Sequence, residues 1–440
     1  MNIFHPRVNN RGATDGITGM QFPAFEYGLA CIYKVTGEHF WVNRLWSLLL
    51  FSLGILFMYW WVFLLSGSTG KGCMAAWFFC WSPELFYHGI NALPDVLAIT
   101  AAIGSLATAY YYLKNRKVTW MLVSMLMLLL AGLTKIQYLM AGSFWIVLLF
   151  LPAKNEVLSR KEKRIIFFSG CMVAIGCVGW YVYARRLIAS SGLADVGLEF
   201  RPQQNWQLAL ETIRHNLVSD IPELLIGYAS LVFLIVGIYI LFKYFNSSNV
   251  NRRPYYLWLF LFVIYYLAEL SQMDEHNYYL LPCLPLLVLI AVAGADYLFK
   301  KRKIVFILLM LSQPVLSAIR IIPSRWTGNN NELPAEFVNA ESRNKLQSAV
   351  ENDAICIMAN DPSGCIWFYF LEKKGFCEGS PGNLKSTDKN GSRLEVEIEK
   401  GARYLYSIDS TLQHDDFFTN HIEEKILQEG SFSVFKLKKL

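Results

Sequence analysis

The sequence is poor in charged residues, which excludes an ordinary soluble globular protein. Asp, Glu, Lys and Arg make up 17% of the 440 residues, whereas 54% are hydrophobic and 15% aromatic. Soluble domains contain about 25% charged residues. The hydrophobic residues are gathered in long runs separated by short polar loops, as in α-helical polytopic membrane proteins. The net charge of +6 lies mostly in those loops, so it indicates membrane orientation and gives no reason to expect nucleic acid as a partner.

Several motifs that would indicate other functions are missing. None of the nine cysteines forms a CxxC pair, so neither a zinc site nor a redox motif is indicated. Asp361-Pro-Ser-Gly364 is not a phosphate loop, and there is no internal repeat. No signal peptide or signal-anchor precedes Leu45.

About ten hydrophobic runs are long enough to suggest membrane-spanning helices. They are Leu45–Ser66, Cys73–Tyr87, Val96–Leu113, Val118–Leu133, Ile136–Leu151, Ile165–Tyr183, Ile221–Leu241, Tyr255–Leu270, Tyr278–Phe299 and Ile304–Ile321. We therefore predict three parts: residues 1–44 as an outer loop with an interfacial helix at Phe22–Tyr33, residues 45–322 as the transmembrane domain, and residues 323–440 as a soluble extracytoplasmic domain. In the last part strands alternate with helices, so we expect a small α/β domain. Its helices are predicted over Pro334–Val350 and Ile366–Lys374, near Leu394–Lys400 and near Phe417–Gln428.

Lysine and arginine concentrate in alternate loops, and the positive-inside rule places those loops in the cytoplasm. The opposite side then carries Asp95, Lys135, Asp274-Glu-His276 and the C-terminal domain. With an even number of spans, Met1 also lies outside.

The ionisable residues lie near the outer ends of the runs, and the middles of the runs carry almost no charge. Transporters and pumps usually place ionisable residues near the midplane, and channels need polar-lined helices. The observed placement suits an enzyme that acts on a lipid-linked substrate at the membrane–water boundary. There, a carboxylate such as Asp95 could act as general base. The cations Lys135, His276 and Arg44 could bind a phosphate leaving group.

Each of these residues also has a purely structural interpretation. Asp95 could be a helix N-cap, Lys135 a snorkelling lysine, and His276 with Tyr278 and Tyr279 part of an interfacial aromatic belt. Arg44 could tie the chain to an outer loop. We assign structural roles to Glu84 and Glu269.

A series of short motifs resembles the GT-C membrane glycosyltransferases, in particular the family 39 group of protein mannosyltransferases and lipid A aminoarabinose transferases. The motifs are Gln21-Phe-Pro23, Asn43-Arg44-Leu-Trp-Ser47, Pro94-Asp95, Leu133-Thr-Lys135 and His276-Asn-Tyr-Tyr-Leu-Leu-Pro282 followed by Pro285. Their order covers nearly the whole chain.

The resemblance implies that the protein transfers a sugar, with inversion, from a polyprenyl-phosphate donor to a lipid, protein or glycan acceptor. The reaction would take place at the outer face of a bacterial cytoplasmic membrane. Asp95 would correspond to the family's second acidic residue, and Lys135, His276, Tyr278 and Tyr279 to positions lining the donor phosphate.

The family places its principal catalytic acid just after its first span. This chain starts within the corresponding outer loop, so we expect a first transmembrane helix upstream of Met1 to be missing. Gln21 replaces an acid or lysine of the family. No cofactor is certain, although Asp274-Glu-His276 could supply one or two ligands to a divalent cation. The alternative is a non-enzymatic transporter or assembly component that binds envelope glycolipids.

Overall fold

The computed structural model describes residues 2–150, 158–191, 193, 200–243, 252–327, 333–388 and 391–440, without the side chains of residues 40, 274, 275 and 388. The chain forms two compact units. The first, the helical unit, comprises Gln21–Tyr183 and Gly197–Gly328; the second, the α/β unit, comprises Asn2–Met20, Ala184–Val196 and Asn329–Leu440.

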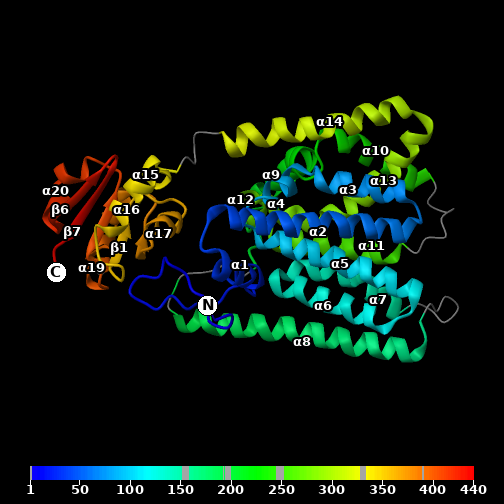
Figure 1. The fold of residues 1–440 in the computed structure, drawn as a ribbon, viewed down its shortest axis with the longest axis horizontal. Coiled ribbons are helices and arrows are strands. Elements are labelled where there is room, and N and C mark those ends of the chain that lie inside the picture. Colours follow the sequence, from blue (N-terminus) through cyan, green and yellow to red (C-terminus); the bar gives the residue numbers. More distant parts are fainter. Residues whose placement is uncertain are drawn as a thin grey trace. The chain divides into compact units, whose positions relative to one another are not determined.

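The helical unit is a bundle whose longer helices run side by side (Figure 1). Its elements are α1 (Ala24–Thr36), α2 (Phe40–Ser66), α3 (Thr69–Cys80), α4 (Pro83–Gly89), α5 (Pro94–Asn115), α6 (Val118–Thr134), η1 (Ile136–Gly142), α7 (Ser143–Leu149), α8 (Arg160–Ser191), α9 (Trp206–His215), η3 (Asn216–Leu225), α10 (Tyr228–Lys243), α11 (Arg253–Ala268), α12 (Leu270–Glu275), η4 (Asn277–Cys283), α13 (Leu284–Lys301), α14 (Lys303–Ile321) and η5 (Ile322–Trp326). The predicted class, a helical polytopic membrane protein, is confirmed.

Fewer full-length spans are present than the ten predicted. Within the described residues, five helices are long and apolar enough to cross a membrane: Trp41–Ser66, Pro94–Asn115, Arg160–Ser191, Asn277–Lys301 and Lys303–Trp326. A sixth is obtained if the bent pair Trp206–Leu225 and Tyr228–Lys243 counts as one span. The predicted runs Val118–Leu133 and Ile136–Leu151 correspond to shorter apolar helices.

Local backbone chemistry explains two of the breaks. The predicted span Cys73–Tyr87 is divided into α3 and α4, because Ser82 is extended and Pro83, at the start of α4, has no N–H to continue the preceding helix. The Ser82 hydroxyl donates instead to the carbonyl of Leu225, at 2.6 Å. Gly227, at φ +78°, allows the 112° bend that divides the predicted span Ile221–Leu241.

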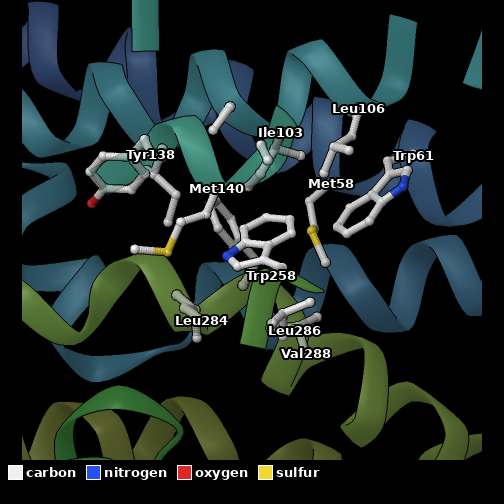
Figure 2. Packing of buried hydrophobic residues seen from close by; sticks show 14 of the residues in the cluster. Met58, Trp61, Ile103, Leu106, Tyr138, Met140, Trp258, Leu284, Leu286 and Val288 are labelled. Atoms are coloured by element: carbon white, nitrogen blue, oxygen red, sulfur yellow. The ribbon is translucent and has the colours of Figure 1, made fainter. Parts of the chain in front are cut away.

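The core of the helical unit is apolar and closely packed. Figure 2 shows side chains from α2, α5, η1, α11 and α13 meeting around Trp258, with Tyr138 and Met140 contributed by η1. Helices α10 and α13 approach each other most closely at two glycines. A Cβ on Gly237 would lie 2.0 Å from the carbonyl oxygen of Ile290, and one on Gly294 would lie 2.0 Å from that of Phe233. Small residues permit such close packing of membrane helices.

The α/β unit confirms the predicted small α/β domain. Its five-stranded sheet has the order β2 (Lys374–Cys377), β1 (Ile355–Met358), β5 (Tyr404–Ser407), β7 (Phe432–Leu437) and β6 (Ile422–Glu429). β1 is parallel to β2 and β5, while β7 is antiparallel to β5 and β6. The helices and the short hairpin are α15 (Ala335–Val338), α16 (Ala340–Ser348), α17 (Ile366–Leu371), α18 (Pro381–Leu384), β3 (Thr387–Asp388), β4 (Gly391–Ser392), α19 (Arg393–Glu399), η7 (Leu412–His414) and α20 (Asp416–His421).

Three sequence-based assignments in this unit were wrong in part. The helix predicted over Pro334–Val350 is split at Asn339, whose side chain caps α16. The helix predicted over Ile366–Lys374 ends at Leu371, and strand β2 begins at Lys374. The helix predicted over Phe417–Gln428 ends at His421, and its remaining residues belong to strand β6.

The edge strand β2 is covered by the N-terminal segment. The carbonyl of Gly375 accepts from the N–H groups of Arg11, at 2.9 Å, and Gly12, at 2.7 Å, and its own N–H donates to the carbonyl of Asn9 at 3.2 Å. These bonds satisfy backbone groups that an exposed edge would leave unpaired.

Candidate active site

A buried ion pair joins two of the residues predicted from the sequence. The Lys135 ammonium lies 3.6 Å from Oδ2 of Asp95. Asp95 is in the first turn of α5, directly after Pro94, and is fully buried, whereas the Lys135 side chain is 17% exposed. Lys135 lies between the end of α6 and the start of η1, and its backbone is extended.

The structural interpretations of these two residues do not hold. The N-cap of α5 is Leu93, and Asp95 makes no capping hydrogen bond. Lys135 does not extend into solvent; its ammonium is directed to a buried carboxylate. Burying two charges costs free energy unless they pair well. Helix capping does not explain why this pair is present.

An aromatic group lies against the ammonium. The nitrogen of Lys135 is 5.5 Å from the ring centre of Tyr279 and 6.0 Å from that of Tyr278. The His276 ring stacks on both, with centroid distances of 5.3 Å to Tyr278 and 5.9 Å to Tyr279. All three rings are half-buried and come from the start of η4. The structure thus brings together Asp95, Lys135 and these three predicted residues, and we call this group the Lys135 cluster.

One further motif, together with the helix that follows it, packs against the same place. The N–H of Phe22, in the Gln21-Phe-Pro23 motif, donates to the carbonyl of Leu133 at 3.0 Å, and its ring meets Trp180 edge to face. Glu26 follows on α1, and its burial raises the pKa of its carboxyl while the charge of Lys135 opposes that rise. Elements far apart in sequence therefore fix the turn that carries Lys135.

Arg44 is not brought into this group. It is exposed in the first turns of α2, and within the described residues its side chain makes no recorded hydrogen bond or ion pair. Its predicted role in phosphate binding stays a prediction. The side chain of Asp274 lies outside the described residues.

Sequence reasoning missed Tyr138, which forms a hydrogen bond to the carboxylate of the ion pair. Its hydroxyl donates to Oδ1 of Asp95 at 3.3 Å, and its ring is buried in the core shown in Figure 2. The signal was available: Tyr138 follows Lys135 by one turn. We had assigned it to an apolar span.

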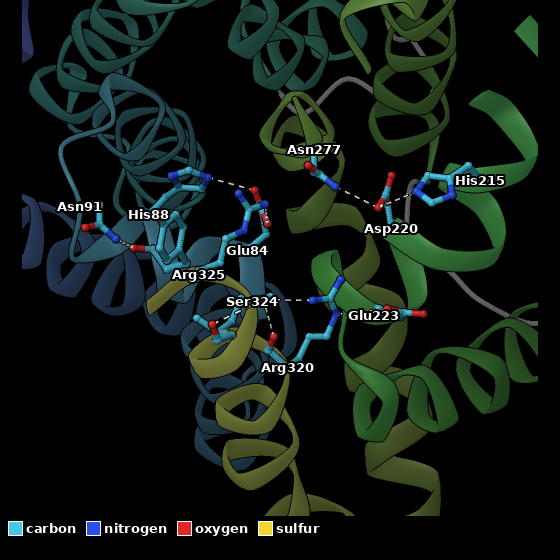
Figure 3. Close-up of polar contacts among 12 residues, drawn as sticks. Glu84, His88, Asn91, His215, Asp220, Glu223, Asn277, Arg320, Ser324 and Arg325 are labelled. Carbon is cyan, nitrogen blue, oxygen red and sulfur yellow. Dashed lines mark hydrogen bonds and ion pairs between the residues drawn. The ribbon is translucent and has the colours of Figure 1, made fainter. Parts of the chain in front are cut away.

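Sequence reasoning also assigned too little to Glu84. This carboxylate is 1% exposed and lies close to two basic side chains, His88 at 2.9 Å and Arg325 at 3.6 Å (Figure 3). The His88 ring packs edge to face on Tyr278, 5.4 Å between centroids, so this second group adjoins the Lys135 cluster. The partner Arg325 belongs to η5, and no local sequence pattern connects it with α4.

A third buried carboxylate, Asp220 on η3, accepts from the amide of Asn277 at 2.9 Å and lies 3.6 Å from Nε2 of His215 (Figure 3). Asn277 directly precedes Tyr278 in η4 and so connects Asp220 to the Lys135 cluster. Within the described part of the chain, no group of three or more His, Cys, Asp or Glu side chains is arranged to hold a metal ion.

The arrangement of the helices is similar to that of solved membrane glycosyltransferases. The archaeal oligosaccharyltransferase AglB from Archaeoglobus fulgidus, in a complex with an inhibitory peptide and a dolichol-phosphate, matches with a TM-score of 0.55 and 10% identity over 92% of this chain and 63% of that one. A second structure of an A. fulgidus oligosaccharyltransferase, with Zn and sulfate, gives 0.51 and 12% identity over 89% and 59%. The chain has the GT-C fold.

The GT-C match is one of structure. ArnT from Cupriavidus metallidurans in the apo state is matched over 94% of this chain and 86% of that one, with a TM-score of 0.48 and 11% identity. The sequence matches no protein-family model, and no curated protein was found to be similar to it. The chain spans about three fifths of the length of the two oligosaccharyltransferase chains.

Proposed function

We propose that this protein transfers a sugar from a polyprenyl-phosphate donor to a lipid, protein or glycan acceptor, as the family 39 resemblance implies. The observation that carries the proposal is the Lys135 cluster, a lysine with a 17% exposed side chain whose ammonium is held by a buried carboxylate beside three aromatic rings. The GT-C fold supports the proposal, because one of the similar structures is a complex with a dolichol-phosphate.

Lys135 is the group suited to contact the donor phosphate. As the anomeric C–O bond breaks, negative charge accumulates on the leaving phosphate, and a fixed ammonium stabilises that charge more in the transition state than in the ground state. The ammonium is already oriented by Asp95, so little reorganisation is needed on donor binding. The ring centres of Tyr278 and Tyr279 lie 6.0 and 5.5 Å from its nitrogen.

The same geometry gives Asp95 a positioning role. With inversion, the acceptor attacks the anomeric carbon from the face opposite to the leaving phosphate, so the base that takes the acceptor proton lies on the far side of the sugar. Asp95 is fully buried and only 3.6 Å from Lys135, which supports a position on the phosphate side of the proposed site. We therefore propose that Asp95 is the supporting acid. The carboxylate base of the proposed mechanism is then another residue.

The proposed location is the outer face of a bacterial cytoplasmic membrane, with the C-terminal domain outside. In the helices long and apolar enough to cross a membrane, charged residues lie towards the ends and the centres are apolar. The Lys135 cluster is at such an end, next to the start of α5. A polyprenyl chain would lie in the bilayer while its phosphate reaches that depth.

Donor binding and turnover provide the test. The full-length protein in lipid nanodiscs would be incubated with a panel of radiolabelled polyprenyl-phosphate sugars, measuring retained donor and released polyprenyl phosphate separately. We expect saturable binding of at least one donor, weakened at least about tenfold by Lys135→Met, because a charge-assisted phosphate contact is lost. Lys71→Met is the matched control, since Lys71 pairs with Asp296, a residue near the C-terminal end of α13.

Each outcome has a defined meaning. If no donor of the panel binds, or if Lys135→Met and Lys71→Met bind equally well, the proposed site is wrong. Binding without release of polyprenyl phosphate would favour the glycolipid transporter or assembly component. In the Asp95→Asn variant we expect weaker donor binding together with slower turnover, whereas a carboxylate base would lower turnover and leave binding intact.

A further inference from the structure

A pocket of about 320 Å³ lies in the α/β unit, in a part of the protein that the proposed transferase reaction does not use. Its wall is formed by β2, the start of the β3–β4 hairpin and helix α19. The lining residues are Phe376, Ser386, Thr387, Arg393, Val396, Glu397 and Lys400. The volume is at the lower end of the range for small-molecule sites.

The polar side of the pocket contains a buried carboxyl group that is not fully satisfied. Glu397 is only 3% exposed although it lines the pocket, and within the described residues its Oε2 has no hydrogen-bond donor. Its Oε1 accepts from Nε of Arg393 at 3.5 Å. Behind it Glu378, 4% exposed, lies 2.5 Å from the same guanidinium nitrogen. A buried polar atom without a partner costs free energy, which a bound ligand that donates a hydrogen bond would recover.

The charges of the pocket select against simple ions. Burial, then the negative charge of Glu378 and a hydrogen bond to it, raise the pKa of Glu397 to about 8, so the protonated carboxyl has Glu378 as one partner and can still accept a hydrogen bond from a ligand. An anion would meet the carboxylate of Glu378 behind the pocket wall. A cation would meet Arg393 and Lys400 at its rim. A neutral ligand with several hydroxyl groups matches donors and acceptors alike.

The opposite side of the pocket is apolar. Phe376 is half-buried, and its ring is held by the N-terminal segment, since a Cβ on Gly12 would lie 2.8 Å from two of its ring atoms. Val396 extends this surface. The face of an aromatic ring carries partial negative charge and attracts the weakly positive C–H hydrogens on one face of a sugar. Together with the hydroxyl groups of Ser386 and Thr387, the pocket offers one polar and one apolar wall.

We propose that this pocket binds a saccharide, whose hydroxyl groups bond to Glu397 and Arg393 and whose C–H face rests on Phe376. The inference does not depend on the transferase proposal, because it concerns binding in the α/β unit alone.

Saturation-transfer difference NMR on the full-length protein in nanodiscs tests the proposal; maltoside detergents are avoided because their headgroups are themselves sugars. The probes are the methyl glycosides of glucose, galactose, mannose and N-acetylglucosamine at millimolar concentration. We expect saturation transfer to at least one glycoside, concentrated on the ring hydrogens of one face. The signal should fall at least about fivefold in Arg393→Met and in Phe376→Leu. Lys425→Met is the control, since it removes one positive charge from the exposed strand β6.

Hydrogen exchange of the β5 amides, measured on the same samples, shows whether each variant keeps its fold. If Arg393→Met loses that protection, Thr387→Val replaces it. Absence of saturation transfer to all four glycosides overturns the proposal. So does a signal that persists in Phe376→Leu and Arg393→Met, because the sugar would then bind elsewhere. Failure of the polyprenyl-phosphate assay would leave this result unaffected.

Discussion

Removing the charge of Lys135 is expected to cost more stability than removing both charges of its ion pair. The ammonium and the Asp95 carboxylate are 3.6 Å apart, which at an effective dielectric constant near 20 corresponds to an attraction of about 4–5 kcal/mol. Lys135→Met leaves a fully buried carboxylate without a counter-charge, and breaking such a pair costs about 3–5 kcal/mol. In the double variant Asp95→Asn with Lys135→Met, no unpaired charge remains, so we expect a loss of about 1 kcal/mol.

Equilibrium unfolding by SDS in mixed lipid–detergent micelles measures these free energies for the wild type, both single variants and the double variant. We expect a coupling energy of at least about 2 kcal/mol between the two positions. Lys71→Met serves as control: its ammonium is 3.4 Å from Asp296, but a third of the side chain is exposed, so the loss should stay below about 1 kcal/mol. Additive effects of the two single substitutions would refute the buried pair.

The double variant also separates stability from function. Because it restores most of the lost stability but lacks the ammonium, we expect it to fold and still fail to bind a polyprenyl-phosphate donor. A double variant that binds donor like the wild type would remove Lys135 from the phosphate site.

Three further predictions concern other parts of the chain. Arg325→Gln should lower the free energy of SDS unfolding by about 1–3 kcal/mol, and Glu84→Gln by less, because the first leaves a buried carboxylate with His88 as its remaining partner, whereas the second leaves an arginine whose side chain is one third exposed. Gly294→Leu should abolish a monodisperse peak in size-exclusion chromatography, because its Cβ would clash with a carbonyl oxygen of α10, whereas Gly170→Leu, with open space around its Cβ, should keep it. The pKa of Glu397 is raised from 4.5 to about 8, so the folded α/β unit binds more protons than the unfolded chain between these pH values. The stability that this group contributes is fully present below about pH 4.5 and is lost as the pH rises through 8. Hydrogen exchange of the β5 amides should therefore speed up over that pH range in the wild type beyond its intrinsic pH dependence, and Glu397→Gln should remove this excess.

The hydrophobic runs predicted the long helices well because length and composition are all that a membrane span requires. Helix α5 covers the predicted run Val96–Leu113 but begins earlier, at Pro94, and α8 extends beyond its predicted run at both ends. Hydropathy could not show where an apolar run breaks. The 112° bend beside Gly227 depends on a left-handed backbone conformation that composition does not report.

In the α/β unit, the strands that were missed are those at the edges of the sheet. β6 has the sequence Ile-Glu-Glu-Lys-Ile-Leu-Gln-Glu, which favours a helix by intrinsic propensity, and most of its side chains are exposed. It is a strand because Gly430, at φ +56°, turns the chain so that β6 pairs with the apolar strand β7. Tertiary pairing overrode local preference at this edge.

The sequence predicted those site residues whose charge stands out at the end of an apolar run. It could not predict a residue whose importance depends on a partner far away in the sequence. Asp95 and Lys135 drew attention as charges at the ends of apolar runs, and the structure joins them. Glu84 is equally costly, but its cation Arg325 comes from the end of the last helix of the bundle, so the pair exists only in three dimensions.

The ion pair itself argues for a functional role of the Lys135 cluster. Two apolar residues of similar size would fill the same space at no cost in desolvation, and such replacements often leave stability equal or higher. Stability alone therefore does not explain why a charged pair occupies this place in a largely apolar bundle. The difference in exposure between the partners supplies the reason: the carboxylate is fully enclosed, while the lysine side chain is 17% exposed and lies beside half-buried rings. A charge held firmly from behind and open on one side is what the recognition of a phosphate at the membrane boundary requires.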